Sequence, residues 1–322
     1  MSRRAFLGTL CVLALAAAPA LAQDYPAKPI RLVVPFPPAG GTDVLSRAVA
    51  QAITNATKWV IVIDNKPGAG GNIGLDTAAK SPPDGYTIAM GQTANLAVNP
   101  ALYSTMPFDP LKDFAPVALL SSQPLILVVD EKSPWKSLAD LVEAAKKSPG
   151  KVNMASSSNG TIGHIGGELF QRRAGIRMTH IPYKGAGPVV ADLMGGSVDC
   201  FFGNTQAVGG LVTSGRLRAL AVTSPKRLGN FPNVPTVAES GYAGFEAATW
   251  SGLVAPAGTP AAIVETLNAA ANKALASGEM KQKLYEDGST PLGGTPKQFA
   301  EFIRSEHAKW GAAVRDAGIK LD

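Results

Sequence analysis

Two glycine-rich segments of this 322-residue chain carry groups that suit anion binding. Glycine lets a backbone approach a ligand closely, and the free N–H groups at the start of a helix attract negative charge. Each segment alone also fits ordinary turn and capping chemistry. The sequence predicts a site for an anion such as a carboxylate on either segment. The first segment supplies Pro38, Ala39, Gly40, Gly41, Thr42 and Asp43, and the second supplies Ser156, Ser157, Ser158, Gly160, Thr161 and His164.

Other polar residues are weaker candidates for the same site. Gln92, Thr93 and Asn204 are uncharged donors that follow predicted strands, a position that ordinary turn residues also occupy. His164 fits a ligand contact or a general acid or base, and it fits equally a polar residue on the first turn of a helix. Asp43 is more typical of a helix cap than of a catalyst.

The sequence contains no complete signature for catalysis or for a cofactor. The glycine-rich stretch 66–74 has Ile73 where a dinucleotide-binding loop needs glycine, and no phosphate-binding Walker motif or G-x-S-x-G elbow occurs. The two cysteines and three scattered histidines predict neither a disulfide framework nor a metal centre. We therefore expect no cofactor, no metal and no catalytic residues, which favours a binding protein over an enzyme.

Composition and charge exclude some partners. The 30 Lys and Arg against 24 Asp and Glu give a net charge of +6, but basic residues occur at most in pairs. Because they form no patch interleaved with aromatic residues, nucleic-acid binding is not expected. The 34 glycines and 25 prolines exceed ordinary usage and indicate many sharply turned loops.

The first 22 residues resemble an export signal. Arg3 and Arg4 precede an apolar stretch, and Ala20-Leu21-Ala22 fits the small-x-small cleavage rule, so we expect the mature chain to begin at Gln23 with a net charge of +4. An uncleaved membrane anchor is the competing interpretation. Residues 2–7 also resemble the twin-arginine export motif, although two ordinary basic residues explain them equally well.

The rest of the chain alternates predicted strands and helices. Segments 30–36, 59–63, 86–90, 117–120 and 125–129 are typical strands, and a helix with a capping box is predicted to begin at Thr295. This alternation predicts an α/β fold with mostly parallel sheets. We expect two lobes with a hinge and a central ligand cleft, lobe 1 comprising residues 23–122 and 225–322 and lobe 2 residues 123–224.

Many short segments in order along the mature chain resemble the substrate-binding proteins of tripartite tricarboxylate transporters, often called Bug proteins. The segments that carry the resemblance are 25–30, 34–43, 65–71, 84–87, 99–103, 160–170, 182–185, 192–196, 218–223 and 255–260.

The resemblance implies a periplasmic, type II binding-protein fold in which residues 39–43 and 156–164 act as pincers on a ligand carboxylate. It implies di- and tricarboxylates, aromatic carboxylates or some amino acids as ligands, and a large and a small membrane subunit as partners. It also places Asn204 and Trp250 in the cleft. Residues 92–96 differ from the serine-rich stretch that relatives have at this place. The difference changes the polar wall expected opposite the pincers and with it the choice of ligand.

The leading hypothesis is thus a monomeric periplasmic receptor for a small organic carboxylate. A binding protein that signals its ligand state to a membrane kinase is one alternative, and the sequence does not separate it from uptake. A secreted hydrolase that uses His164 is the other, and the missing nucleophile motif counts against it.

Overall fold

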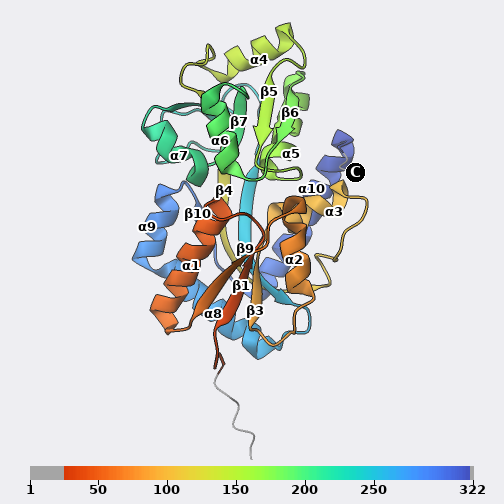
Figure 1. Ribbon diagram of the computed structural model, residues 1–322, viewed down its shortest axis with the longest axis vertical. Coiled ribbons are helices and arrows are strands. Elements are labelled where there is room, and N and C mark those ends of the chain that lie inside the picture. The colour runs from red at the N-terminus through yellow and green to blue at the C-terminus, as the bar shows by residue number, and fades with distance from the viewer. Residues whose placement is uncertain (1–24, 320–322) are drawn as a thin grey trace, which may run out of the picture.

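The computed structural model describes residues 25–319, and these fold into two α/β lobes stacked along the long axis of the molecule (Figure 1). The predicted signal peptide, residues 1–22, lies outside the described residues. No helix in residues 25–319 is long and apolar enough to cross a membrane. The two-lobed α/β architecture expected from the sequence is confirmed.

The lower lobe in Figure 1 packs helices around a sheet of strands β1, β2, β3, β9 and the first part of β4. Its sheet order is β2-β1-β3-β9-β4, with the short β10 on β4. Its elements are β1 (Ile30–Val34), α1 (Gly41–Thr57), β2 (Ile61–Asn65), η1 (Ala69–Gly71), α2 (Asn72–Ala79), β3 (Thr87–Gln92), η2 (Ala94–Val98), α3 (Asn99–Leu102), β9 (Ala248–Pro256), α8 (Ala261–Ala276), α9 (Gly278–Glu286), β10 (Thr290–Pro291) and α10 (Pro296–Ala317).

The upper lobe repeats the strand–helix alternation. Strands β5 and β6 pair in parallel, and β5 also pairs in parallel with β7. Its elements are α4 (Leu138–Lys147), β5 (Asn153–Ser156), α5 (Ile162–Ala174), β6 (Thr179–Pro182), α6 (Ala186–Gly195), β7 (Cys200–Asn204), α7 (Thr205–Thr213) and β8 (Leu217–Val222).

One long strand, β4 (Phe114–Asp130), joins the lobes. Its first part pairs with β9 as far as Pro124 opposite Ala248, and from Leu125 onward it pairs with β7 and β8. The sequence predicted two strands separated by residues 121–124, and this was wrong. Pro124 falls where the strand changes partners, and a proline there is tolerated because it pairs at the boundary of the two sheets.

The sheets are mixed, so the expectation of mostly parallel sheets was also wrong. Parallel pairing holds for β1 with β2 and β3 and for β5 with β6 and β7, whereas every pairing of β4 and β9 is antiparallel. Only β4 runs through both sheets, and β9 lies antiparallel to it in the lower sheet. Alternation of strands and helices predicts the parallel units but carries no information on these returning strands.

The segment between β8 and β9 contacts the upper lobe. Val222 forms a bridge with Thr236, and Phe245 packs edge-on against Phe170 of the upper lobe. Ala247 donates its N–H to Thr223 before β9 begins. The lobe boundaries remain our proposal, and these contacts favour placing residues 225–247 with lobe 2 rather than with lobe 1.

Helix α10 packs along both lobes on the side where the chain crosses (Figure 1). The predicted capping box is present, because Thr295 accepts from the N–H of Gln298 and Gln298 accepts from the N–H of Thr295. Phe299 and Trp310 lie in the largest apolar cluster, which also contains Phe170 and Phe202 of the upper lobe. The lobes therefore share one apolar core behind the crossing strands.

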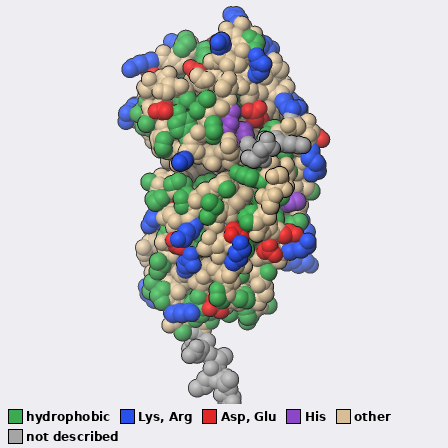
Figure 2. Space-filling model, turned by 45° about the vertical axis from the view of Figure 1, so that its right-hand side comes forward, with side chains coloured by type: hydrophobic (Ala, Val, Ile, Leu, Met, Phe, Trp, Pro, Cys, Tyr) green, Lys and Arg blue, Asp and Glu red, His purple; other side chains and the backbone are tan. Residues whose placement is uncertain are grey.

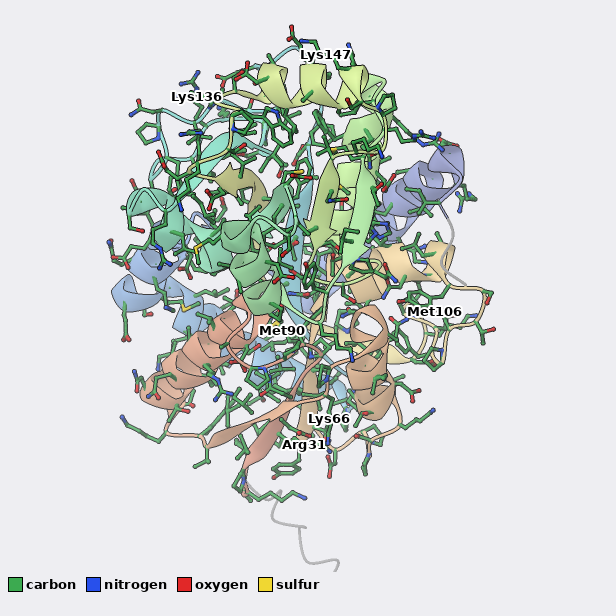
Figure 3. The ribbon with its side chains drawn as sticks, turned by 45° about the horizontal axis from the view of Figure 1, so that its top comes forward. Arg31, Lys66, Met90, Met106, Lys136 and Lys147 are labelled. Atoms are coloured by element: carbon green, nitrogen blue, oxygen red, sulfur yellow. The ribbon has the colours of Figure 1, made fainter. Side chains whose placement is uncertain are left out.

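Basic side chains are spread over the outside of the molecule. Figure 3 shows Lys136 and Lys147 at the outer end of the upper lobe and Arg31 and Lys66 in the lower lobe. Arg31 and Lys66 each pair with Asp64. The positive net charge is thus distributed rather than gathered into one patch among these residues.

Candidate ligand-binding site

A cavity of about 170 Å³ lies between the lobes and opens on the face where they meet. Figure 2 shows the surface indented along the junction of the two lobes. We call this space the interlobe cavity. Its walls come from the β1–α1 loop and the end of β3 in the lower lobe, and from the β5–α5 loop, the β6–α6 loop and the start of α7 in the upper lobe. Sites for drug-sized ligands span roughly 300–1,000 Å³, so this volume suits a small molecule.

Four helices begin at the interlobe cavity. The N-cap residues of α1, α5, α6 and α7 all line it, and they are Gly40, Thr161, Gly185 and Asn204. Three of these caps, all but Thr161, make no side-chain hydrogen bond to their own helix. Each helix N-terminus carries unpaired N–H donors and roughly half a positive charge. The cavity therefore offers a positive potential from both lobes.

Charged side chains add to this potential. Lys184 is the one charged residue among those that line the cavity in the described part of the chain. Asp43, the nearest acid in the sequence, is 2% exposed, and its carboxylate accepts from the N–H of Ala39 (2.9 Å), from Nε of Arg47 (2.9 Å) and from Nδ2 of Asn65 (2.9 Å). Burial opposes ionisation of Asp43, but these hydrogen bonds outweigh it and hold its pKa below the usual range. Asp43 thus fixes the loop and leaves the cavity without a negative charge.

The first pincer, residues 39–43, is held in a close turn. Ala39 has a positive φ of 63°, which its bond to Asp43 stabilises. Thr42 accepts from Nε2 of Gln92 at 2.8 Å, so the end of β3 supports the first turn of α1. A Cβ on Gly41 would lie 3.0 Å from Oε1 of Gln206 and 3.3 Å from Nδ2 of Asn204. Glycine at 41 therefore allows the two lobes to approach each other here.

The second pincer, residues 156–164, is fixed from below by two histidines. The N–H of Gly160 donates to Nδ1 of His164 at 3.2 Å, and the ring of His164 stacks on His180. The Oγ atom of Ser156 lies 2.6 Å from Nε2 of His180 and donates to the carbonyl of Ser158 at 3.0 Å. Burial lowers the pKa of His164 to about 3 and that of His180 to about 4. Both rings are therefore neutral at neutral pH, and His164 can accept a hydrogen bond.

The predicted site residues separate into two groups. Asp43, Thr93, Ser156, Ser158, Gly160 and His164 lie behind the cavity wall, where they hydrogen-bond to the loops or to neighbouring strands. The residues that line the interlobe cavity are Pro38, Ala39, Gly40, Gly41, Thr42, Gln92, Ser157, Thr161 and Asn204.

Trp250 does not line the cavity, and its expected place in the cleft was wrong. It is 2% exposed, its indole N–H donates to Glu306 at 2.9 Å, and its ring packs edge-on against Phe299. The sequence also missed the β6–α6 loop, which forms one wall of the cavity together with the first turn of α6, residues 186–188. In this loop, as in the two pincers, a predicted strand is followed by a glycine-containing turn and a helix. That pattern could have identified the loop as part of the site.

No group of three or more His, Cys, Asp and Glu side chains within residues 25–319 is arranged to hold a metal ion. Cys200 is buried, and burial raises the pKa of its thiol. The site is thus built from backbone N–H groups, hydroxyls, amides and one lysine.

Comparison with known proteins agrees with this geometry. The family model described as "Tripartite tricarboxylate transporter family receptor" matches residues 45–319. The chain is 42% identical to Protein BugT of Bordetella pertussis over 98% of both chains. Among solved structures it resembles Rpa4515 of R. palustris with adipate (TM-score 0.89, 38% identity, 92% of this chain and 100% of that one). It also resembles the periplasmic binding protein BugD (TM-score 0.88, 32% identity, 92% of this chain and 100% of that one).

Proposed function

The chain belongs to the family of tripartite tricarboxylate transporter receptors, and on that premise we propose that it captures a small organic carboxylate in the interlobe cavity for uptake. The observation that carries the proposal is the convergence of four helix N-termini on one cavity, whose lining within residues 25–319 includes no acidic side chain. A carboxylate accepts hydrogen bonds from several N–H groups at once and is favoured by the helix dipoles. The adipate carried by the similar structure supports the same ligand class.

Within this proposal the residues that line the cavity and those behind its wall have different roles. Gly40, Gly41 and Thr42 from the lower lobe and, from the upper lobe, Ser157 and the first turn of α5 that Thr161 caps present donors to one carboxylate. The residues behind the wall, His164 and Asp43 among them, hold the loops in place. Because the donors come from both lobes, a bound ligand favours lobe closure over opening.

Receptors of this family are periplasmic binding proteins. For this chain we propose export by a signal peptide at residues 1–22, cleaved before Gln23, by either the general or the twin-arginine route. The proposed partners are a large and a small membrane subunit of a secondary transporter, and the receptor acts as a monomer. A receptor that reports its ligand to a membrane kinase would use the same cavity, so ligand binding supports both roles.

We further propose that the protein binds its ligand without converting it. A hydrolase using His164 is disfavoured because this ring is 4% exposed, accepts a hydrogen bond from Gly160 and stacks on His180. A general base needs hydrogen-bond reach to the proton it removes, and His164 lies behind the wall.

The test is a calorimetric titration of the mature chain after unfolding and refolding to remove any carried ligand. Adipate is compared with its neutral diamide, adipamide, which has the same length and no charge. We expect adipate to bind and to raise the melting temperature by mass action, and adipamide to do neither. Equal binding of the two would contradict an anion site, and turnover of bound adipate would contradict a receptor.

A further inference from the structure

The β6–α6 loop forms a third wall of the interlobe cavity that the two pincers do not account for. It is tied to the second pincer, because Tyr183 donates its N–H to Ser156 at 3.0 Å and Gly185 donates to Ser157 at 2.7 Å. It faces the β1–α1 loop of the lower lobe, because a Cβ on Gly185 would lie 3.6 Å from Cγ of Pro37. The loop therefore bridges the two lobes at the edge of the cavity.

Lys184 sits in this loop between two anchored neighbours. The hydroxyl of Tyr183 donates to Asp192 at 2.6 Å, which directs that carboxylate to Tyr183. Lys184 itself is exposed and pairs with no carboxylate in residues 25–319. Its ammonium group therefore has no counter-ion among the described residues, and those that line the cavity include no acid.

We infer that Lys184 is a specificity-determining residue that pairs with a second carboxylate at the far end of the ligand. The inference rests on the proposed function, which places the first carboxylate at the N-termini of α1 and α5. A dicarboxylate would then meet donors at one end and a cation at the other. A monocarboxylate of the same length would leave Lys184 without a partner.

The same arrangement disfavours ligands that carry an ammonium group. Such a group would meet Lys184 and four positive helix ends, and no carboxylate would compensate it because Asp43 is already bonded to Arg47, Ala39 and Asn65. Like charges at close range repel, and an unpaired charge in a cavity loses hydration. Lys184 thus selects for a dianion and against a zwitterion.

The experiment measures affinity for three six-carbon probes by calorimetry: adipate with two carboxylates, hexanoate with one, and 6-aminohexanoate with one carboxylate and one ammonium group. Butyrate with succinate and valerate with glutarate form two shorter pairs. For wild type we expect the dicarboxylate of at least one pair to bind about tenfold or more tightly than its monocarboxylate, and 6-aminohexanoate to bind most weakly. This preference should narrow as ionic strength rises, since Lys184 is exposed.

The variants separate a charge effect from a structural one. Lys184→Met should weaken the preferred dicarboxylate about five- to twentyfold and leave its monocarboxylate within about twofold, because only the pairing charge is removed. Lys184→Arg keeps the charge and should stay within about threefold of wild type. Lys151→Met, a basic residue of the same lobe that does not line the cavity, is the matched control and should change neither affinity.

Three results would contradict, respectively, the role of Lys184, the second carboxylate subsite and the proposed function. If Lys184→Met weakens both members of a pair equally, or weakens neither, Lys184 does not determine specificity. If wild type binds monocarboxylates as tightly as dicarboxylates, the second subsite is absent. If wild type binds none of these acids, the proposed function itself fails.

Discussion

The imidazole rings of His164 and His180 stack face to face, with centroids 3.8 Å apart and planes 11° from parallel. The two residues come from α5 and β6, and the pair lies directly behind the second pincer. Two cationic rings at this distance would repel, so the arrangement requires that at least one ring stay neutral.

Stability should therefore fall on mild acidification. Histidines of the unfolded chain titrate near pH 6.5, whereas burial lowers the pKa of His164 to about 3 and of His180 to about 4. The unfolded chain binds protons first, so the free energy of unfolding declines between about pH 6.5 and 4 and is unaffected by this pair above pH 7. The slope approaches roughly 1.4 kcal/mol per pH unit for each histidine. Urea denaturation at stepwise pH measures it.

His180→Gln should reduce that slope, because one of the two histidines whose pKa rises on unfolding is removed. The matched control is His307→Gln on α10, a histidine outside the stacked pair. An unchanged slope in His180→Gln, or an equal reduction in both variants, would contradict this account of the pair.

Thr161→Val should weaken ligand binding and cost stability. Its hydroxyl caps α5 by accepting from the N–H of His164, and it donates to the carbonyl of Ser158 at 2.8 Å. Loss of a helix cap costs about 1 kcal/mol. Because the hydroxyl also ties the second pincer to Ser158, its loss should displace that loop and weaken adipate binding about three- to tenfold. Calorimetry and thermal unfolding measure the two effects.

Thr295→Val provides the control for that variant. Thr295 caps α10 by the same geometry but does not line the interlobe cavity. It should lose similar stability and keep its ligand affinity. If both variants lose affinity alike, the effect of Thr161 comes from stability and not from the site.

Gly41→Ala should impair closure of the lobes. The added Cβ would lie 3.0 Å from Oε1 of Gln206 and 3.3 Å from Nδ2 of Asn204, both from the opposite lobe. We expect at least tenfold weaker adipate binding and a smaller ligand-induced decrease in radius of gyration by X-ray scattering. Gly210→Ala on α7 meets no atom within 4 Å and should leave both quantities unchanged. Compaction of Gly41→Ala equal to that of wild type would argue against this role.

Glu306→Ala should destabilise the core shared by the lobes. Glu306 is 9% exposed and accepts from the indole N–H groups of Trp250 and Trp310, each at 2.9 Å. Removing it leaves two buried donors unpaired, which we expect to cost about 2–4 kcal/mol in urea denaturation. Glu301→Ala on the exposed face of the same helix is the control and should cost well under half as much. Equal losses would show that helix propensity, not the indole bonds, explains the effect.

Much of the fold could be predicted from local patterns. The strand–helix alternation and the capping box at Thr295 depend on residues close in sequence, and both are present. The single strand β4 and the antiparallel pairing of β9 were not predicted. Strand pairing is decided by segments far apart in the chain. Residues 121–124 have the composition of a turn, and they are extended here because β4 pairs with β9 and then with β7.

The site shows the same division. The glycines, hydroxyls and helix starts that supply donors were found because strand-to-helix loops have a recognisable composition. Which of those side chains line the cavity was not predictable. His164 and Asp43 have the chemistry of ligand contacts, yet His164 bonds to Gly160 and Asp43 to Ala39, Arg47 and Asn65.

By itself, the sequence indicated which residues supply neutral donors on glycine-rich loops and that the basic residues are dispersed along the chain. These properties follow from residue type and local spacing. Only the tertiary structure decided that four helix N-termini converge on one cavity, that Lys184 lies at its edge and that His164 and His180 stack on each other. The physical reason is that the position of one lobe against the other depends on the pairing of β4 and β9. These strands are far apart in the chain, so no local sequence pattern predicts their pairing.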